Sequence, residues 1–420
     1  MARERENLFN NIDWTLVILY LVLVLMGWLN IYAAVYNEDH KSILDLSQSY
    51  GKQMLWIVSS LFVALVILLT DARFFSIFAY AIYGLTILSL IAVLSVGSVV
   101  SGSKSWFDIG GFRLQPAEFA KFATNLAIAR FFSTQNINVK DFKTRFIPLV
   151  LLGLPALLIL LQNDTGSALV YMSFVLVLYR MGLSGNFLLA GVLIVVVALS
   201  TLMVGHLNVI IGLTVAAGLL FAFMKRSRKN IINLVALLLL GIGFAFSVEY
   251  VMDNVLIEHQ RTRINVLLGK ELDLKGAGYN VHQSKIAIGS GGFSGKGFLN
   301  GTQTKYNFVP EQSTDFIFCT VGEEWGFLGA LVVITLFIVF LIRIVNNAER
   351  QRSTFSKMYG YGVASILFFH FAVNIGMTIG LVPVIGIPLP FFSYGGSSLW
   401  AFTILVFIFI KLDANRNALF

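Results

Sequence analysis

The sequence predicts an all-α, polytopic membrane protein, and three observations carry this prediction. Apolar runs of about 20 residues, the length of a membrane-spanning helix, recur along the whole 420-residue chain. Charged residues make up only 12% of the chain, about half the share in a soluble domain. The basic residues lie in the gaps between apolar runs, as they do where they orient a protein in a bilayer. These observations exclude a soluble globule and a disordered chain, and they disfavour nucleic-acid binding.

The apolar runs predict about twelve membrane spans. The first run is too long for the apolar core of a cleavable signal peptide, so we expect it to be kept as an anchor. The predicted spans are residues 14–36, 54–69, 74–99, 116–132, 147–161, 166–179, 187–204, 208–224, 231–250, 318–345, 358–379 and 397–410.

The placement of positive charge predicts the orientation of these spans. If the N-terminus with Arg3 and Arg5 is cytoplasmic, the even-numbered gaps should carry the basic residues, and they do. The short gap at 205–207, on the other face, has no Lys or Arg. We therefore expect both termini to be cytoplasmic. The residues that carry the pattern are Arg73, Lys140, Lys143, Arg145, Arg180, Lys225, Arg226, Arg228, Lys229, Arg343, Arg350, Arg352, Lys357, Lys411 and Arg416.

Three segments of the predicted outer face are not simple connections: residues 101–115, 251–317 and 380–398. Residues 251–317 form a loop long enough to hold short amphipathic helices and to carry function. Residues 380–398 are apolar but rich in Pro and Gly. Irregular backbone survives in hydrocarbon only when it is buried in protein or lines a wet cavity, so this segment is expected to be re-entrant.

Glycines and cations gather in the long outer loop. Tight glycine turns can offer N–H groups to phosphate oxygens, and nearby cations would add to the attraction. The pattern predicts a site for an anionic head group, and the alternative is a glycine-rich loop with solvated charges. The spacing matches no nucleotide-binding motif. The residues concerned are Gly289, Gly291, Gly292, Gly295, Gly297, Arg261, Arg263, Lys285 and Lys296.

Asp315 is the sharpest single candidate for chemistry. It lies in PEQSTDFIF (310–318), where a polar loop meets the apolar run of the tenth span. A partly desolvated carboxylate at a membrane boundary is a candidate general base. The alternative is that Thr314 or Asp315 caps the helix that follows. Glu323 and Glu324, farther along that helix, are expected to pair with buried polar groups.

Polar residues inside other predicted spans leave alternatives open. Glu118 and Lys121 are three apart on one helical face and can pair, either as a structural pin or as the floor of a substrate cavity. Asp164 is either a helix cap or a cavity wall. His370 and Asn374, one turn apart, could form a proton relay or hydrogen bonds between helices. No zinc-type ligand spacing occurs.

At these motifs the sequence resembles the SEDS family, the shape, elongation, division and sporulation proteins. The motifs occur in family order over nearly the whole chain, and GKGFLNGTQ favours the elongation branch over the division branch. The matching segments are WFDIGGFRLQPAEFAK (106–121), QNDTGSA (162–168), RTRINVLL (261–268), GAGYNVHQSKIAIGSGGFSGKGFLNGTQ (276–303), PEQSTDFIF (310–318), GEEWGF (322–327) and GIPLPFFSYGGSS (386–398).

The resemblance implies a peptidoglycan glycosyltransferase that polymerises lipid II during cell-wall elongation, on the outer face of the bacterial cytoplasmic membrane. It implies that Asp315 is the general base and that Trp106 matters for activity. It also implies a divalent cation, Mg²⁺ or Mn²⁺, and no nucleotide. The residues implied to line or brace the central cavity are Arg113, Gln115, Glu118 and Lys121.

The partners implied are lipid II, the growing glycan strand, and a class B penicillin-binding protein, the transpeptidase of the cell-elongation complex. Two other functions stay open at this stage. A bundle with charged cavity residues could be a lipid II flippase, although its polar residues gather at one face rather than through the full membrane depth. It could also be a non-catalytic scaffold for the penicillin-binding protein.

Three departures from the family pattern stand out. Family members have about ten spans, and the extra pair at 187–224 is expected to be an insertion that leaves the sidedness of later spans unchanged. Ser313 replaces a histidine that is common before the TD pair, which removes a titrating neighbour of Asp315. Asn163 replaces a proline before Asp164, which leaves the role of Asp164 open.

Overall fold

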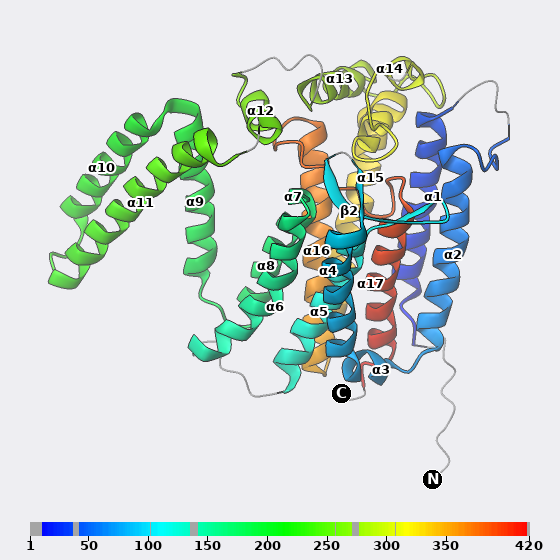
Figure 1. The fold of residues 1–420 in the computed structure, drawn as a ribbon, viewed down its shortest axis with the longest axis horizontal. Coiled ribbons are helices and arrows are strands. Elements are labelled where there is room, and N and C mark those ends of the chain that lie inside the picture. The colour runs from blue at the N-terminus through cyan, green and yellow to red at the C-terminus, as the bar shows by residue number, and fades with distance from the viewer. Residues whose placement is uncertain are drawn as a thin grey trace, which may run out of the picture. The chain divides into compact units, whose positions relative to one another are not determined.

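A computed structural model describes residues 11–36, 42–100, 102–134, 142–256, 258–270, 277–306 and 308–417 (Figure 1). The chain divides into two compact units, which are described separately. The first comprises Met1–Gly182 and Asn280–Phe420, and the second comprises Leu183–Tyr279. The chain is mostly helical, as the sequence predicts.

The first unit is a helical bundle organised around helices α5, α16 and α17. Helix α16 packs against α5, α15 and α17, and α5 also packs against α4. Of the described helices that are long and apolar enough to cross a membrane, α16 and α17 are the most buried, with 72% and 83% of their most apolar 18 residues covered. Helix α5 is also largely buried, and the three form the centre. The helices of this unit are α1 (Trp14–Ala34), α2 (Ser49–Leu69), α3 (Ala72–Ile77), α4 (Ala79–Val96), α5 (Pro116–Thr134), α6 (Phe142–Leu161), α7 (Thr165–Leu169), η1 (Val170–Ser173), α8 (Phe174–Arg180), α14 (Thr302–Lys305), α15 (Ile317–Glu349), α16 (Thr354–Thr378) and α17 (Gly396–Ala414).

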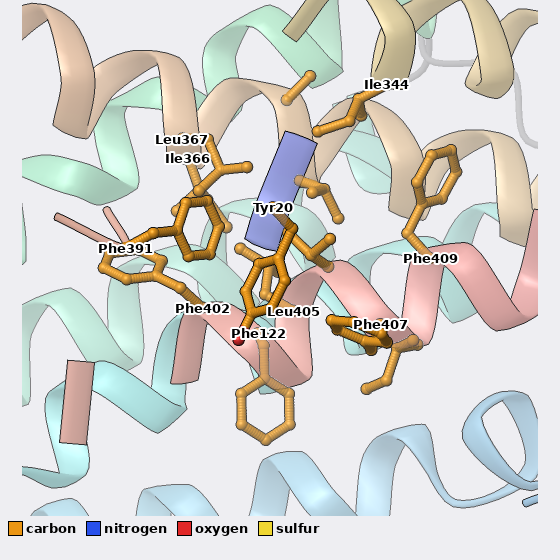
Figure 2. Close-up of a cluster of buried hydrophobic side chains, with 14 of the residues drawn as sticks. Tyr20, Phe122, Ile344, Ile366, Leu367, Phe391, Phe402, Leu405, Phe407 and Phe409 are labelled. Atoms are coloured by element: carbon orange, nitrogen blue, oxygen red, sulfur yellow. The ribbon is translucent and has the colours of Figure 1, made fainter. Parts of the chain in front are cut away.

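Aromatic side chains fill the core between α1, α17 and the non-helical segment that joins α16 to α17 (Figure 2). Tyr20 of α1 meets the rings of Phe391 and Phe407 edge-on, with ring centroids 5.1 Å apart in both pairs. Its hydroxyl lies 2.8 Å from Oγ1 of Thr403, so the buried phenol is hydrogen-bonded. Phe391 belongs to residues 380–395, hereafter the linking segment. This segment is part of the core, as irregular backbone inside a membrane protein must be.

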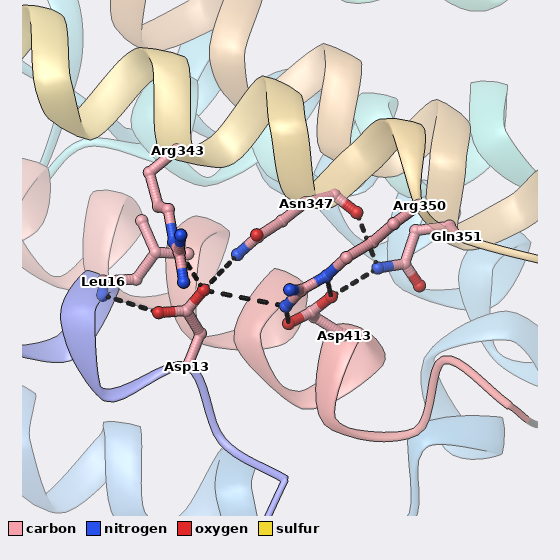
Figure 3. A network of polar contacts seen from close by, with 7 residues as sticks. All are labelled: Asp13, Leu16, Arg343, Asn347, Arg350, Gln351 and Asp413. Carbon is pink, nitrogen blue, oxygen red and sulfur yellow. Dashed lines mark hydrogen bonds and ion pairs between the residues drawn. The ribbon is translucent and has the colours of Figure 1, made fainter.

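The two ends of the first unit differ in character. The start of α1 and the end of α17 lie at one end, and the β-strands and α14 lie at the other (Figure 1). At the first end Asp13 accepts hydrogen bonds from Arg343 Nε at 2.8 Å and from Asn347 Nδ2 at 2.7 Å, and Arg350 pairs with Asp413 (Figure 3). This network ties together the ends of α1, α15 and α17. The side of the membrane on which each end lies stays a prediction, and Arg3, Arg5 and Lys140 are outside the described residues.

A small antiparallel sheet at the other end was not predicted. Strands β1 (Ser98–Val100), β2 (Ser103–Ile109) and β3 (Phe112–Leu114) are ordered β1-β2-β3. The tight turn between β2 and β3 uses Gly110 and Gly111, both with positive φ, as two-residue hairpins require. The predicted span at 74–99 is therefore too long: α4 ends at Val96 and the β-branched residues after it pair as a strand.

Each predicted span overlaps at least one helix, but the number of membrane spans stays a prediction. Among the described residues, nine helices are long and apolar enough to cross a membrane. Helix α6 and the succession α7, η1 and α8 are shorter apolar segments, the latter covering the predicted span 166–179. Helix α5 occupies the predicted span 116–132 and carries three charged residues, Glu118, Lys121 and Arg130.

The second unit consists of α9 (Gly185–Val204), α10 (His206–Phe223), α11 (Arg228–Asn254) and α12 (Glu258–Leu267). The first three contain long apolar stretches of which only 6% is buried, as expected for helices that face lipid. The predicted insertion at 187–224 corresponds to α9 and α10, and its status as an insertion stays a prediction. Helix α13 (Ala277–Ser290) begins in this unit and continues into the first.

Candidate functional site

Asp315 lies in the turn just before α15. The N-cap position of that helix is Phe316, whose side chain cannot accept a hydrogen bond. Whether Thr314 or Asp315 caps the helix therefore stays open, beside the reading of Asp315 as a general base. The Asp315 side chain is half-buried.

The backbone around Asp315 is fixed by three hydrogen bonds to successive carbonyl groups. The carbonyl of Ser313 accepts from the N–H of Tyr394 at 2.8 Å. The carbonyl of Thr314 accepts from Oγ of Ser393 at 2.6 Å. The carbonyl of Asp315 itself accepts from Nδ2 of Asn374 on α16 at 2.9 Å. The linking segment and α16 thus hold the peptide units on both sides of this carboxylate.

The carboxylate of Asp315 faces the bend of the linking segment at Gly386. A Cβ atom built on Gly386 would lie 3.3 Å from Oδ2 of Asp315. Gly386 has a φ of 70°, a left-handed conformation that favours glycine. Glycine therefore suits position 386 for two reasons: it adopts the left-handed backbone conformation, and it has no Cβ atom that would crowd the Asp315 carboxylate.

Glu118, Lys121 and His370 form a fully buried polar cluster between α5 and α16. The ammonium group of Lys121 lies 2.7 Å from Oε1 of Glu118 and 3.0 Å from Nε2 of His370. It also lies 4.9 Å from the centroid of the Phe402 ring, a cation–π distance. Nδ1 of His370 lies 3.1 Å from the carbonyl oxygen of Pro388. The predicted pairing of Glu118 with Lys121 is present, and it sits inside the bundle as a brace.

The residues before α5 are attached to two other elements. Nε2 of Gln115 donates to Oδ2 of Asp164 at 2.7 Å, and the other carboxylate oxygen of Asp164 caps α7. Oγ of Ser397, in the first turn of α17, donates to the carbonyl of Arg113. The Arg113 side chain is exposed. Asp164 therefore acts as a helix cap, which was one of its two predicted roles, and its other carboxylate oxygen accepts a hydrogen bond from Gln115.

Trp106 lies on β2 and is partly exposed. Its carbonyl accepts a hydrogen bond from Oγ of Ser98 at 3.2 Å. The sheet is anchored by two hydrogen bonds at the carbonyl of Gln162, from the N–H of Lys104 and from Oγ of Ser103. Trp106 is therefore carried on a hairpin fixed to the end of α6.

Residues 291–301, hereafter the glycine-rich loop, pack their backbone against a break in α15. Helix α15 is interrupted at Gly326, where φ is 64° and ψ is −158°. The N–H groups of Lys296 and Gly297 donate to the carbonyls of Glu323 and Glu324, at 3.0 and 2.9 Å. In return the N–H of Phe327 donates to a loop carbonyl.

The loop glycines serve this close packing. A Cβ on Gly291 would lie 2.0 Å from a carbonyl oxygen of α15, and one on Gly295 would lie 2.1 Å from another. The N–H groups of Gly291, Gly292, Gly295 and Gly297 all donate to protein carbonyls. The expectation that these amides bind phosphate is therefore not supported, because they are used within the protein.

The predicted cations occupy different surroundings. Nζ of Lys296 lies 2.8 Å from a carboxylate oxygen of the fully buried Glu323 and also donates to Thr302, so it secures the loop. Lys285 is exposed on α13, with its ammonium group against Gly380 at the start of the linking segment. In the second unit, Arg261 of α12 pairs with Asp253 of α11 at 2.9 Å. Arg263, also on α12, is half-buried.

The resemblance implies a divalent cation, and the side chains near Asp315 can be compared with the ligands that such an ion needs. Within the described ranges, no group of three or more His, Cys, Asp and Glu side chains is placed to hold a metal. Mg²⁺ keeps several waters and is commonly held by one or two carboxylates together with substrate phosphates. The turn before α15 offers Asp315 and the exposed Glu311. These residues fit an ion shared with a phosphorylated substrate better than an ion enclosed by protein.

Sequence reasoning missed Ser393 and Ser397 as structural partners of the site. Both serines lie in an apolar stretch that is rich in Pro and Gly, and a buried hydroxyl is costly when it has no hydrogen-bond partner. That cost was the available signal that they bind backbone atoms elsewhere. The identity of those atoms depends on long-range packing.

Comparison with known proteins gives a consistent result. The family model described as the FtsW, RodA and SpoVE cell cycle protein matches residues 13–211 and 207–418. Peptidoglycan glycosyltransferase RodA of Treponema pallidum is 34% identical over 433 residues, covering 97% of this chain and 98% of the relative. Peptidoglycan glycosyltransferase MrdB of Escherichia coli K12 is 33% identical over 410 residues, covering 97% and 95%.

Two solved structures share the fold. One is a chain from a structure that describes the coordination of polymerization and crosslinking by a peptidoglycan synthase complex. Its TM-score is 0.72 and its sequence identity is 26%, and the match covers 97% of this chain and 99% of that chain. The rod shape determining protein RodA of Thermus thermophilus has a TM-score of 0.64 and 24% identity, covering 98% and 99%. From its motifs, its fold and these full-length matches, the chain belongs to the FtsW/RodA/SpoVE family of cell cycle proteins, the SEDS family.

Proposed function

We propose that this protein is an integral membrane peptidoglycan glycosyltransferase that polymerises lipid II into glycan strands, with Asp315 as the general base. The names of its full-length relatives support the reaction class. The observation that carries the assignment to Asp315 is its setting: a half-buried carboxylate whose backbone is fixed and whose Oδ2 faces the glycine bend at Gly386.

In this proposal Asp315 accepts the proton of the acceptor sugar's 4-hydroxyl as that oxygen attacks the anomeric carbon of the donor. The bond from the anomeric carbon to undecaprenyl pyrophosphate breaks, and the pyrophosphate leaves with its electron pair. Cationic side chains stabilise the charge that develops on the leaving group. Lys285 and Arg113 are the exposed candidates in the first unit, since Lys296 is bound to Glu323.

A divalent cation fits the carboxylates of the turn, Glu311 and Asp315, as its protein ligands. When bound, it would supply a positive charge beside the leaving pyrophosphate. The partner that we propose is a class B penicillin-binding protein in the cell-elongation complex. The structural relative from a complex that coordinates polymerization and crosslinking supports this partner class. We place the protein in the bacterial cytoplasmic membrane, with both termini cytoplasmic and Asp315 on the outer face.

The test is polymerisation of labelled lipid II by the purified full-length protein in proteoliposomes, with and without the penicillin-binding protein. Asp315→Asn keeps the shape of the side chain and removes the base, so glycan ladders should disappear. The matched control is Asp71→Asn, which removes an exposed carboxylate at the other end of the first unit and keeps its helix cap.

The same preparation separates the other two functions. Full polymerisation by Asp315→Asn would remove the role assigned to this residue. Transfer of lipid II between leaflets without glycan formation would identify a flippase. If neither activity occurs with the wild-type chain in either preparation, and the transpeptidase still binds, the protein is a scaffold.

A further inference from the structure

Two polar residues of α16, one helical turn apart, hold the same short stretch of the linking segment. His370 and Asn374 are both fully buried. Nδ1 of His370 lies 3.1 Å from the carbonyl oxygen of Pro388, and Nδ2 of Asn374 lies 2.8 Å from the carbonyl oxygen of Ile387. These carbonyls immediately follow Gly386, the residue that faces the Asp315 carboxylate.

Asn374 also reaches the candidate base itself. Its amide group has two N–H donors, and the second donates to the carbonyl of Asp315 at 2.9 Å. One amide therefore bridges the main chain at Asp315 and the main chain next to Gly386. The separation between the carboxylate and the bend is set by this bridge.

The partners of His370 determine which of its ring nitrogens carries the proton. A lysine ammonium group only donates, so Nε2 of His370 must accept from Lys121. A carbonyl only accepts, so Nδ1 must donate to Pro388. His370 is therefore neutral with its proton on Nδ1. This tautomer requires the ammonium group of Lys121 to stay in place, and Glu118 holds it there at 2.7 Å.

We propose that His370 and Asn374 are positioning residues for Asp315, and that Glu118 and Lys121 act through them. The brace runs from Glu118 through Lys121 and His370 to Pro388, and Asn374 joins the adjoining Ile387 to Asp315. This inference rests on the proposed function, because it assigns these residues to the alignment of the general base. It also gives Glu118 and Lys121 a role that needs no contact with substrate.

A loss of alignment has a specific kinetic consequence. The brace contacts the main chain around the base and the bend opposite it, whereas the pyrophosphate of lipid II is assigned to exposed cations. Loosening the brace should therefore lower kcat and leave the KM for lipid II within about twofold, because misplacement of a catalytic group by about 1 Å costs roughly 100-fold in rate.

The test compares Asn374→Leu with Asn125→Leu. Asn125 is also fully buried, and its Nδ2 donates to the carbonyl of Tyr359 at 2.9 Å. Tyr359 is about four turns of α16 away from Asn374. Asn374→Leu removes two hydrogen bonds to main-chain carbonyls and Asn125→Leu removes one, so both should lower the unfolding temperature. Only Asn374→Leu should lower kcat, by roughly 10- to 100-fold.

A second pair of variants tests the brace through His370. His370→Leu removes one acceptor of the Lys121 ammonium group, which keeps its ion pair with Glu118, and removes the donor to the Pro388 carbonyl. His370→Gln provides an amide that can accept from Lys121 and donate to Pro388. We expect kcat to fall in the leucine variant and to recover at least in part in the glutamine variant, at matched lipid II KM.

The outcomes separate this inference from the proposed function. If Asp315→Asn is inactive but Asn374→Leu keeps the kcat of Asn125→Leu, or if His370→Gln is no better than His370→Leu, the positioning role is wrong and the function stands. A variant that raises KM while kcat is unchanged would instead place that residue in substrate binding. If Asp315→Asn polymerises lipid II normally, both proposals fall together.

Discussion

Gln115 and Asp164 are joined by a hydrogen bond of 2.7 Å between residues 49 positions apart. The other carboxylate oxygen of Asp164 accepts a hydrogen bond from the N–H of Ser167 at 3.0 Å. One oxygen therefore caps α7, and the other binds Gln115, the residue just before α5. This bond brings together two motifs that the sequence shows only as separate segments.

Because Asp164 makes two hydrogen bonds through its carboxylate, its replacement by Ala should lower stability more than its replacement by Asn. Asp164→Ala removes a helix cap and an interaction with the Gln115 amide, which together should cost about 2 to 4 kcal/mol of unfolding free energy. Asp164→Asn keeps one acceptor oxygen and should cost less. Thermal unfolding in detergent measures both. Asp71→Ala is the control, since Asp71 caps the exposed end of α3 and should cost only about 1 kcal/mol. Equal losses for both alanine variants would contradict the double role.

Gly386→Ala should reduce polymerisation more than it reduces stability. The new methyl group would lie 3.3 Å from Oδ2 of Asp315, in a backbone conformation with φ of 70°. Gly205→Ala is the matched control, because Gly205 has φ of 85° and open space around its Cβ position. Both positions have a positive φ, so both variants carry a conformational cost of about 1 to 3 kcal/mol. Glycan synthesis normalised to folded protein should fall only in Gly386→Ala, and a similar loss in both would mean that strain alone is responsible.

Lys285 and Lys296 should respond differently to replacement. Lys285→Ala removes an exposed cation beside the linking segment, so the KM for lipid II should rise while the unfolding temperature changes little. Lys296→Ala removes the partner of the buried Glu323, so the unfolding temperature should drop. Lipid II titrations and thermal unfolding of both variants measure the contrast. A raised KM with unchanged stability in Lys296→Ala would restore its predicted role as a substrate cation.

Gly326→Ala should separate the glycine-rich loop from α15. The added Cβ would lie 2.3 Å from the backbone nitrogen of Gly295, and the φ and ψ values of Gly326 are accessible essentially to glycine alone. We expect a loss of about 3 kcal/mol or more. Gly218→Ala in α10 is the control, since it meets open space within a helix and should be neutral or slightly stabilising. Thermal unfolding gives the comparison, and equal stability of the two variants would count against the packing described for the loop.

Stability should depend on pH through Asp13, which lies just before α1. Burial opposes ionisation of this carboxyl, but hydrogen bonds from Asn347 and Arg343 outweigh it and lower its pKa below the ordinary value of 3.8. A lowered pKa in the folded state stabilises the fold above pH 3.8, and this contribution is lost as the pH falls through the folded-state pKa. The unfolding temperature of Asp13→Asn should therefore fall less steeply between about pH 5 and pH 3 than that of the wild type. Parallel pH curves would contradict this.

The helices of the bundle were predictable because hydropathy and length act locally. Helix α5 was predicted despite its charged residues. The structure explains how two of them can be buried, because Glu118 and Lys121 form an ion pair inside the core. Their spacing of three residues was visible in the sequence. The hairpin was missed although Gly110 and Gly111 separate two runs of strand-forming residues, because the apolar residues before it extended the preceding span.

The partners of the candidate site were less predictable. Asn374 and Asp315 are 59 positions apart, and no periodicity in the sequence links them. The glycines between positions 289 and 297 were compatible with anion binding and with close packing, and composition does not distinguish these uses. Only the position of α15 against the loop, with its break at Gly326, decides between them.

The backbone amides of Lys296 and Gly297 donate to carbonyls of α15, and those of Gly291, Gly292 and Gly295 donate to carbonyls of α13 and of the loop itself. Under the proposed function, the affinity for an anionic substrate therefore depends on exposed side chains such as Lys285. Substitutions at such positions can change that affinity without loss of structure, whereas a side chain at Gly291 or Gly295 would collide with carbonyl oxygens of α15.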